Sequence, residues 1–159
     1  MKKRLLPALL ILLCLPARAE ILLRDDTQIE VRLAAPARRI VSLAPNITEV
    51  VYAAGAGGKL VGSVDFSDYP AAAKQLPRVG SYARVDIEAV AALRPDLVLA
   101  WDSGNPPASV TQLRKLGIPV FVTEPRTLDD IPRDLERYGR MAGTESISAK
   151  AAGEFRRKL

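Results

Sequence analysis

Short apolar runs alternate with segments of helical periodicity from residue 39 onward. The runs are apolar at consecutive positions, which is typical of strands buried on both faces of a parallel sheet. The segments between them carry apolar residues three and four positions apart, as Ile87, Val90 and Ala91 do. This alternation predicts an α/β unit, Rossmann-like, with a central mostly parallel sheet between two layers of helices. Strands are predicted at 40–43, 59–63, 96–100 and 118–122, and helices at 46–54, between Asp86 and Pro95, at 108–116, from Thr127 to Gly143, and from 144 onward.

Turn and cap residues set the limits of several elements. Residues 20–33 predict an N-terminal β-hairpin whose acidic turn lies at 25–27. Asn46 with Glu49 three residues later fits a capping box at a helix start, and Asp86 fits the same role for the next helix. Pro119 places the last strand at an edge of the sheet or at its own first residue.

The first 19 residues have the composition of a secretory signal peptide. A basic cluster at 2–4 precedes an apolar run from 5 to 15, and Ala17 and Ala19 supply small residues before a cleavage site. A membrane anchor is the alternative, but a spanning helix needs roughly 20 apolar residues. Cleavage after Ala19 is predicted, and with it an exported protein. Cys14 is interpreted as part of this signal, because Leu13 is not the small residue that a lipoprotein signal prefers.

Removal of residues 1–19 changes the charge and the chemistry that remain. The segment holds four of the 23 basic residues and none of the 18 acidic ones, so the net charge falls from +5 to +1. A near-neutral chain lacks the basic face that nucleic acid requires. The chain has no histidine, and its single cysteine is removed, which excludes histidine-based metal sites, Ser-His catalysis and thiolate chemistry. We therefore expect a binding protein that is not an enzyme and carries no cofactor.

Four sequence blocks occur in the order and at the spacing of a known family. They are residues 39–49, residues 61–62 with 67–70, residues 93–101, and residues 113–120. Together they resemble the periplasmic iron-siderophore and vitamin B12-binding family of ABC importers. Ala100-Trp101 followed by Gly104-Asn105 is most similar to the vitamin B12-binding branch.

The resemblance implies two α/β lobes joined by one long helix, with the ligand in the cleft between them. The loaded protein would deliver its ligand to an ABC permease at the inner membrane. The expected organisation is a signal peptide at 1–19, an amino-terminal lobe at 20–143, and the start of the inter-lobe helix at 144–159. This helix is expected to be truncated and the second lobe to be absent.

Candidate ligand-binding residues lie in loops that follow the predicted strands, where open α/β sheets bind ligands. Four of the eight aromatic residues after residue 19 fall there, and aromatic faces suit a large ligand such as cobalamin. Asn105 supplies an amide for the amide-edged corrin ring. Packing at the rim is the alternative for Trp101, and anchoring of the loop for Tyr69. The predicted ligand-binding residues are Phe66, Tyr69, Tyr82, Trp101 and Asn105.

Two positions depart from what the resemblance implies. Phe66 stands where the vitamin B12-binding branch has a ligand-contacting tyrosine, so the ring is kept and the hydroxyl is lost. Pro107 stands where that branch has a glutamate that pairs with permease arginines, and nearby Asp102 is the candidate substitute for permease docking.

Two further hypotheses remain open. Arg78 and Arg84 lie near the binding loops and suit an anionic ferric siderophore, and haem is a third possible ligand of the same fold. Alternatively, the lobe is truncated and only folds or associates with another chain. The apolar stripe of Ile147, Ala151, Phe155 and Leu159 is the feature that bears on association.

Overall fold

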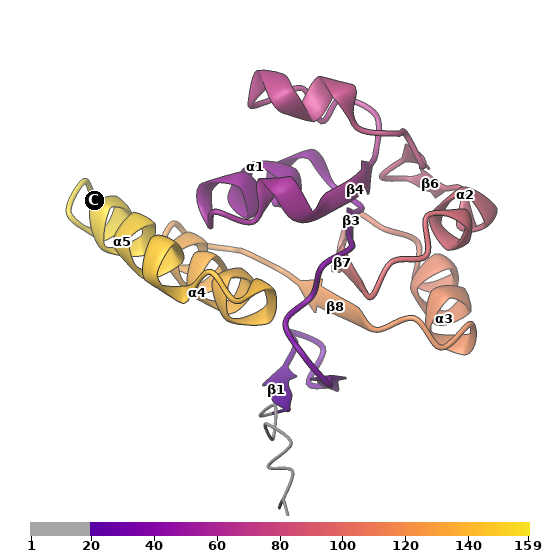
Figure 1. Ribbon diagram of the computed structural model, residues 1–159, viewed down its shortest axis with the longest axis horizontal. Coiled ribbons are helices and arrows are strands. Elements are labelled where there is room, and N and C mark those ends of the chain that lie inside the picture. The colour runs from indigo at the N-terminus through magenta and orange to yellow at the C-terminus, as the bar shows by residue number, and fades with distance from the viewer. Residues whose placement is uncertain (1–19) are drawn as a thin grey trace, which may run out of the picture.

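The computed structural model describes residues 20–159, so the predicted signal peptide lies outside the described residues. The described chain opens with the predicted hairpin, in which β1 (Ile21–Arg24) pairs antiparallel with β2 (Glu30–Leu33). The turn between them is the acidic segment at 25–28, and Gln28 adopts a left-handed conformation with φ of 68°. The hairpin projects from one end of the lobe (Figure 1).

A four-stranded parallel sheet forms the centre of the lobe and confirms the predicted fold class. Its strands are β3 (Ile40–Ser42), β4 (Leu60–Ser63), β7 (Leu97–Trp101) and β8 (Val120–Thr123), in the spatial order β4-β3-β7-β8. β8 is an edge strand, as Pro119 predicts. The chain crosses from β4 over β3 to β7, so the strand order reverses beside β3, and open sheets of this kind bind ligands beyond the carboxyl ends of the strands at such a point.

Helices cover both faces of the sheet (Figure 1). On one side lie α1 (Pro45–Ala53), α4 (Asp130–Ala142) and α5 (Glu145–Arg156). On the other lie α2 (Ile87–Ala92) and α3 (Pro107–Lys115). The segment between β4 and α2 holds a 3-10 turn at Ala71–Gln75 and a small antiparallel ribbon of β5 (Gly80–Ser81) and β6 (Arg84–Val85).

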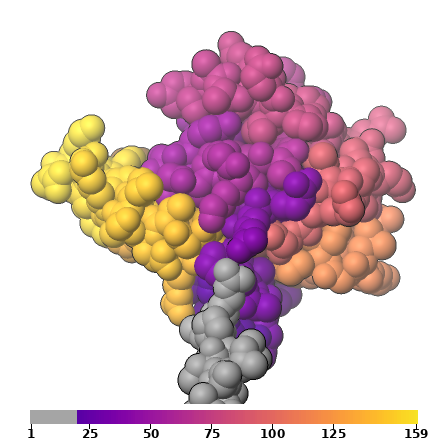
Figure 2. Space-filling view, in the orientation of Figure 1, coloured from indigo at the N-terminus to yellow at the C-terminus, as the bar shows by residue number. Residues whose placement is uncertain are grey.

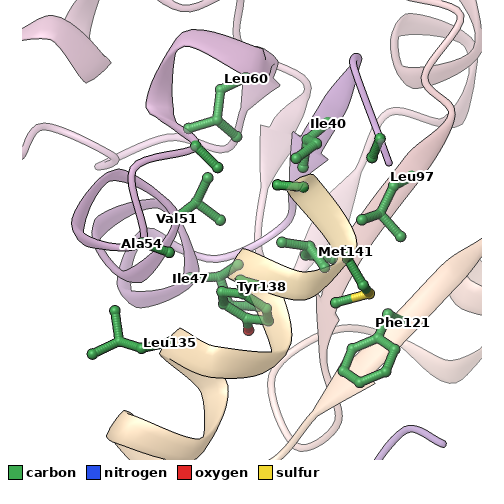
Figure 3. Packing of buried hydrophobic residues seen from close by; sticks show 14 of the residues in the cluster. Ile40, Ile47, Val51, Ala54, Leu60, Leu97, Phe121, Leu135, Tyr138 and Met141 are labelled. Atoms are coloured by element: carbon green, nitrogen blue, oxygen red, sulfur yellow. The ribbon is translucent and has the colours of Figure 1, made fainter. Parts of the chain in front are cut away.

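Alternate residues along each central strand point into two separate cores. In β7, Leu97 and Leu99 belong to the core beneath α1 and α4, whereas Val98 and Ala100 belong to the core beneath α2 and α3. Figure 3 shows the first core, where Tyr138 of α4 lies among side chains from α1 and the strands. A strand buried on both faces reads as one continuous apolar run, which explains the pattern in the sequence.

Two helix details differ from the predictions, and a third agrees with them. Asn46 does not cap α1, because Pro45 already occupies the first helical turn and Ala44 is the extended cap residue without a side-chain bond. The helix predicted from Thr127 begins instead at Asp130, so Leu128 lies in the preceding loop, where it is exposed. Asp86 does cap α2 as predicted, since its carboxylate accepts from the Ala89 N–H at 2.9 Å.

The C-terminal helix packs through small residues, and its predicted apolar stripe is divided, with Ala151 against the core, Phe155 half-buried, and Ile147 and Leu159 exposed. A side chain at Gly139 of α4 would meet the Ser148 hydroxyl of α5, whose Oγ lies 1.9 Å from an added Cβ. Ser148 and Ala152 are the buried residues of α5. Ile147 and Leu159 are 52% and 59% exposed, and the helix end protrudes at one side of the space-filling view (Figure 2).

The turn of the hairpin is tied to β8 by a network of charged groups. Asp25 is buried, and its carboxylate accepts from the Arg114 guanidinium at 2.9 Å and from the Val122 N–H at 3.3 Å. Asp26 accepts from Arg137 at 2.7 Å and from the Glu124 N–H at 2.7 Å. The Asp26 N–H also donates to the Val122 carbonyl at 3.0 Å. The turn thereby covers part of the open edge of β8, which would otherwise be available for pairing with another strand.

Buried Asp134 of α4 joins this network, which we call the hairpin clamp. Its carboxylate accepts from Arg137 at 3.3 Å and from Arg133 at 3.4 Å. Burial raises the pKa of Asp134 above the usual aspartate range despite these two guanidinium groups. The hairpin clamp therefore contains Asp25, Asp26, Arg114, Arg133, Asp134 and Arg137.

Candidate functional site

Loops from the carboxyl ends of the parallel strands carry the predicted aromatic residues. Phe66 and Tyr69 follow β4, Tyr82 lies in the turn between β5 and β6, and Trp101 is the last residue of β7. Their exposed fractions are 76% for Phe66, 70% for Tyr69 and 41% for Tyr82. Large aromatic side chains are seldom this open to water without a partner. We call Phe66, Tyr69, Tyr82 and Trp101 together the aromatic edge.

Tyr82 and Trp101 form a ring pair within the aromatic edge. Their ring centroids are 6.0 Å apart and their planes are inclined by 50°, which is a favourable aromatic geometry. The indole also lies against the backbone of Gly104, where an added Cβ would be 1.8 Å from Cε3. A side chain at position 104 would thus displace the indole. Trp101 is partly buried by these two contacts, so rim packing and ligand contact are compatible for this residue.

Asn105 is buried directly behind the ring pair, and its side chain is fully engaged within the protein. Its Oδ1 accepts from the Trp101 N–H at 2.7 Å, and its Nδ2 donates to the Leu43 carbonyl at 2.9 Å and to the Tyr82 carbonyl at 2.8 Å. An amide has two N–H donors, and both are used here. These three bonds are all made within the protein, and the ligand contact predicted for Asn105 from the sequence stays a prediction.

A buried hydroxyl cluster holds the loop that carries Phe66 and Tyr69. The Thr48 Oγ1 of α1 is 2.9 Å from the Ser42 Oγ and 3.2 Å from the Ser67 Oγ. All three residues are buried. Phe66 itself has a φ of 65°, an uncommon conformation for a bulky residue, and the neighbouring Ser67 contact keeps the turn in place.

Arg78 braces the same loop from inside. Its guanidinium donates to the Ser63 hydroxyl at 2.6 Å, the Val64 carbonyl at 3.2 Å, and the Ser67 carbonyl at 3.1 Å. It also pairs with Asp68 at 3.3 Å. These bonds occupy the donors that an anionic chelate would need from Arg78. Arg84 is exposed at the β6 end of the ribbon.

A mainly apolar groove of about 630 Å³ lies beside the aromatic edge, between α1 and α4. No pattern in the sequence indicates this groove, because its residues come from helices and loops far apart in the chain. Tyr69 lines the groove, so Tyr69 and the Tyr82–Trp101 pair face different parts of the surface. The apolar residues that line the groove include Ile47, Val50, Leu128, Ile131, Leu135 and Phe155.

Asp102 and Pro107, the two positions that bear on permease docking, follow Trp101 along the chain. Asp102 is exposed, and its backbone N–H donates to the Thr123 carbonyl at 3.0 Å. Nearby, the Glu124 carboxylate accepts from the Ser103 N–H at 3.0 Å. Pro107 begins α3, where a proline is favourable because the first helical N–H has no partner. Asp102 is therefore an exposed carboxylate on a backbone segment that is bonded to the end of β8.

Two findings on the described residues concern metal binding and membrane-spanning helices. Within residues 20–159, no group of three or more acidic, cysteine or histidine side chains is arranged to hold a metal ion. Over the same residues, none of the helices combines the length and apolar character needed to cross a bilayer. What the described part of the chain offers is an aromatic surface supported by the neutral hydrogen bonds of Asn105 and the hydroxyl cluster, with the Arg78 guanidinium bracing one loop.

Comparison with known proteins identifies the family. The model of the periplasmic binding protein family matches residues 40–159. The chain belongs to this family. A curated relative from Vibrio cholerae, named vitamin B12-binding protein, is 43% identical over 124 residues, which are 78% of this chain and 45% of the relative. The chain thus spans about half the length of the curated relatives that it matches.

Solved structures agree with this assignment. The periplasmic vitamin B12-binding protein BtuF of Vibrio cholerae superposes with a TM-score of 0.75 at 43% identity, covering 78% of this chain and 49% of that protein. A periplasmic haem-binding protein from Pseudomonas aeruginosa superposes with a TM-score of 0.72 at 32% identity, covering 77% and 44%. The lobe architecture is therefore shared by relatives with different ligands.

Proposed function

We propose that this chain is the amino-terminal lobe of an ABC importer's substrate-binding component and that its aromatic edge contacts cobalamin. The observation that carries the proposal is the exposure of Phe66, Tyr69 and Tyr82 in loops at the carboxyl ends of the parallel strands, where Tyr82 pairs with Trp101. The 43% identity to a protein named for vitamin B12 binding supports the choice of ligand.

The physical chemistry of the edge suits a large, flat ligand. Burial of a large apolar side chain contributes about 1.5–3 kcal/mol when complete, and rigid rings lose little side-chain entropy on binding. The supports behind the rings, Asn105 and the Ser42–Thr48–Ser67 hydroxyls, are neutral. Because Arg78 is engaged internally, Arg84 is the arginine of this region that stays exposed toward an anionic ligand. These features favour cobalamin over a ferric siderophore.

The wider role in this proposal follows the family. We propose that residues 1–19 direct export and are cleaved after Ala19, that residues 20–143 form the periplasmic binding lobe, and that 144–159 begin the inter-lobe helix. The protein then acts by binding and delivery to a permease, without catalysis and with cobalamin as ligand in place of a cofactor. Exposed Asp102 is proposed as the acidic contact for permease arginines, since such pairs steer association.

Calorimetric titration of the purified chain with cyanocobalamin tests the ligand. We expect binding that is weakened by Tyr69→Ala, because the variant removes an exposed ring from the aromatic edge. Leu116→Ala is the matched control, since it truncates a similarly exposed apolar residue at the end of α3. The absence of binding heat, together with free passage of cobalamin in equilibrium dialysis, would refute the proposed ligand contact.

Haem is the second candidate, favoured by the 32% identical haem-binding relative. Exposed tyrosines at the aromatic edge add to it, because a tyrosine oxygen is a known axial ligand of haem iron. Competition between cyanocobalamin, haemin and a ferric siderophore separates the ligands. Displacement of cobalamin by haemin at equal concentration would favour haem, and displacement by the ferric chelate would favour the siderophore hypothesis.

Association with another chain remains a third candidate, because Ile147 on α5 and Leu159 beyond its end are both exposed. Light scattering after size-exclusion chromatography distinguishes it. A mass that rises with concentration and returns to the monomer value in Ile147→Ser would support association through this face. A monomer at all concentrations would contradict it.

A further inference from the structure

We propose that Asn105 is a positioning residue that fixes the distance and angle between Tyr82 and Trp101, with Gly104 providing the space for the indole. The inference rests on the proposed function for its biological meaning, because it concerns the same aromatic edge. Its structural content is independent of any ligand. It assigns the Gly104-Asn105 pair a task distinct from contact with cobalamin.

The hydrogen bonds of Asn105 join three segments that are separate in the chain. Leu43 follows β3, Tyr82 lies in the turn between β5 and β6, and Trp101 ends β7. The bond from Asn105 to the Leu43 carbonyl bridges 62 positions, and the bond to the Tyr82 carbonyl bridges 23. One side chain thus connects the point where the strand order reverses to both members of the ring pair.

Burial makes this connection specific for an amide. Asn105 is 4% exposed and Leu43 is fully buried, so the Leu43 carbonyl without its amide donor would lack water as an alternative partner. Only a side chain with two donors and one acceptor satisfies the Leu43 carbonyl, the Tyr82 carbonyl and the Trp101 N–H together. Rotation of the amide would place an oxygen against a carbonyl, so the arrangement has a single favourable orientation.

Gly104 completes the support from the other side of the indole. Its N–H donates to the Trp101 carbonyl at 3.3 Å, and the ring lies where the Cβ of any other residue would stand. The ring is thereby held by the Gly104 backbone and by Tyr82, while Asn105 fixes the backbone of both aromatic residues. Pre-organisation of this kind lowers the entropy lost when a ligand binds.

Spectroscopy of the unliganded chain tests the proposal, because Trp101 is the only tryptophan. Asn105→Asp keeps the size and the acceptor but removes both donors. We expect loss of the near-ultraviolet circular dichroism of the ring pair, a red shift of Trp101 emission and greater quenching by acrylamide, with far-ultraviolet dichroism retained. Asn46→Asp is the matched control, since Asn46 is the other asparagine of the chain and is exposed on α1.

Two more variants keep the test decisive if Asn105→Asp does not fold. Asn105→Ser retains one donor and one acceptor, so a partial loss of the same signals is expected. Gly104→Ala leaves the Asn105 bonds but displaces the indole, so the near-ultraviolet signal changes while the fold persists. Wild-type spectra in folded Asn105→Asp or in Asn105→Ser would overturn the role of Asn105, and wild-type spectra in Gly104→Ala would overturn that of Gly104.

Cobalamin titration then separates this inference from the proposed function. For a chain that binds cobalamin, folded Asn105→Asp is expected to bind roughly tenfold more weakly, the scale of a lost buried hydrogen bond. Unchanged cobalamin affinity in that variant would overturn a role in binding. If the wild-type chain binds no cobalamin while Asn105→Asp loses its spectral signature, the proposed function fails and the positioning role stands.

Discussion

The hairpin clamp and the supports of the aromatic edge both hold loops against the sheet, but they use different chemistry. The clamp pairs three aspartates with three arginines, including Asp26 with Arg137 at 2.7 Å. The supports of the aromatic edge include Asn105 and the Ser42–Thr48–Ser67 hydroxyls, which are neutral. The clamp secures a turn that covers a strand edge, whereas the neutral groups secure the surface proposed to meet a ligand.

The comparison shows two ways in which a lobe can hold a loop against its sheet. They differ in the charge that they place near the surface. Charged pairs are strong where they are buried and oriented, but their contribution changes with pH and salt. The contribution of hydrogen bonds between neutral groups changes less with pH and salt. Such bonds also add no net charge behind the surface proposed to bind a ligand. Four predictions follow from this contrast, each measured as the free energy of unfolding in urea.

Asp25→Ala is expected to cause the largest loss of stability. The variant leaves Arg114 without its buried partner and the Val122 N–H without its acceptor, and breaking a buried ion pair typically costs about 3–5 kcal/mol. Asp102→Ala is the control, since Asp102 is an exposed aspartate. Similar urea midpoints for the two variants would show that the hairpin clamp contributes little.

Thr48→Val is expected to cost about 1–3 kcal/mol, because the variant keeps the shape of the side chain but leaves the Ser42 and Ser67 hydroxyls without their shared partner. Its loss should be the same in low and high salt. A strong salt dependence would contradict the neutral character of the support.

Asp134→Asn tests the charged hairpin clamp through the pH dependence of the free energy of unfolding. Because burial raises the pKa of Asp134 in the folded state, the folded protein retains the proton longer than the unfolded chain. Stability from this group is therefore present below the unfolded pKa and is lost as pH rises through the folded pKa. Asp134→Asn should remove that decrease. A wild-type pH profile in the variant would assign the decrease to another group.

The matched comparison is Asp130→Asn on the same helix. The backbone N–H groups of Arg126 and Thr127 lower the pKa of Asp130, so this carboxylate contributes stability above the unfolded pKa that is lost as pH falls through the folded one. The two variants should therefore change the acid limb of the profile in opposite directions.

Glu136→Gln is expected to have the smallest effect. Glu136 and Arg156 form an exposed pair between α4 and α5, with oxygen–nitrogen distances of 2.6 and 3.1 Å. The Arg156 side chain lowers the pKa of Glu136, yet exposed pairs are screened by water and salt. A loss comparable to that of Asp25→Ala would contradict the distinction between buried and exposed pairs.

Sequence patterns predicted the fold well because the central strands are buried on both faces. Asp86 was identifiable as a cap from its position before an apolar helical stripe, and Gly143 as a stop, where it adopts φ of 69°. Asn46 was misassigned because a nearby Pro45 starts α1 one residue earlier. A capping pattern alone does not distinguish a cap from a first-turn residue.

The candidate site was only partly predictable, because its supports depend on contacts across the chain. The aromatic residues could be placed in loops after the strands, but the internal bonds of Asn105 and Arg78 join segments that no local pattern connects. The acidic turn at Asp25 was predicted as a turn. Its burial against Arg114, 89 positions away, was not indicated by any pattern in the sequence.

The hairpin clamp also constrains the order in which the lobe can be assembled. Asp25 bonds to Val122 across 97 positions, and Asp26 bonds to Arg137 across 111. The turn between the two earliest strands therefore has no partners for these two aspartates in the hairpin clamp until β8 and α4 are in place. Contacts this distant in sequence slow folding, so the hairpin at the start of the chain is expected to be among the last parts to become protected from hydrogen exchange.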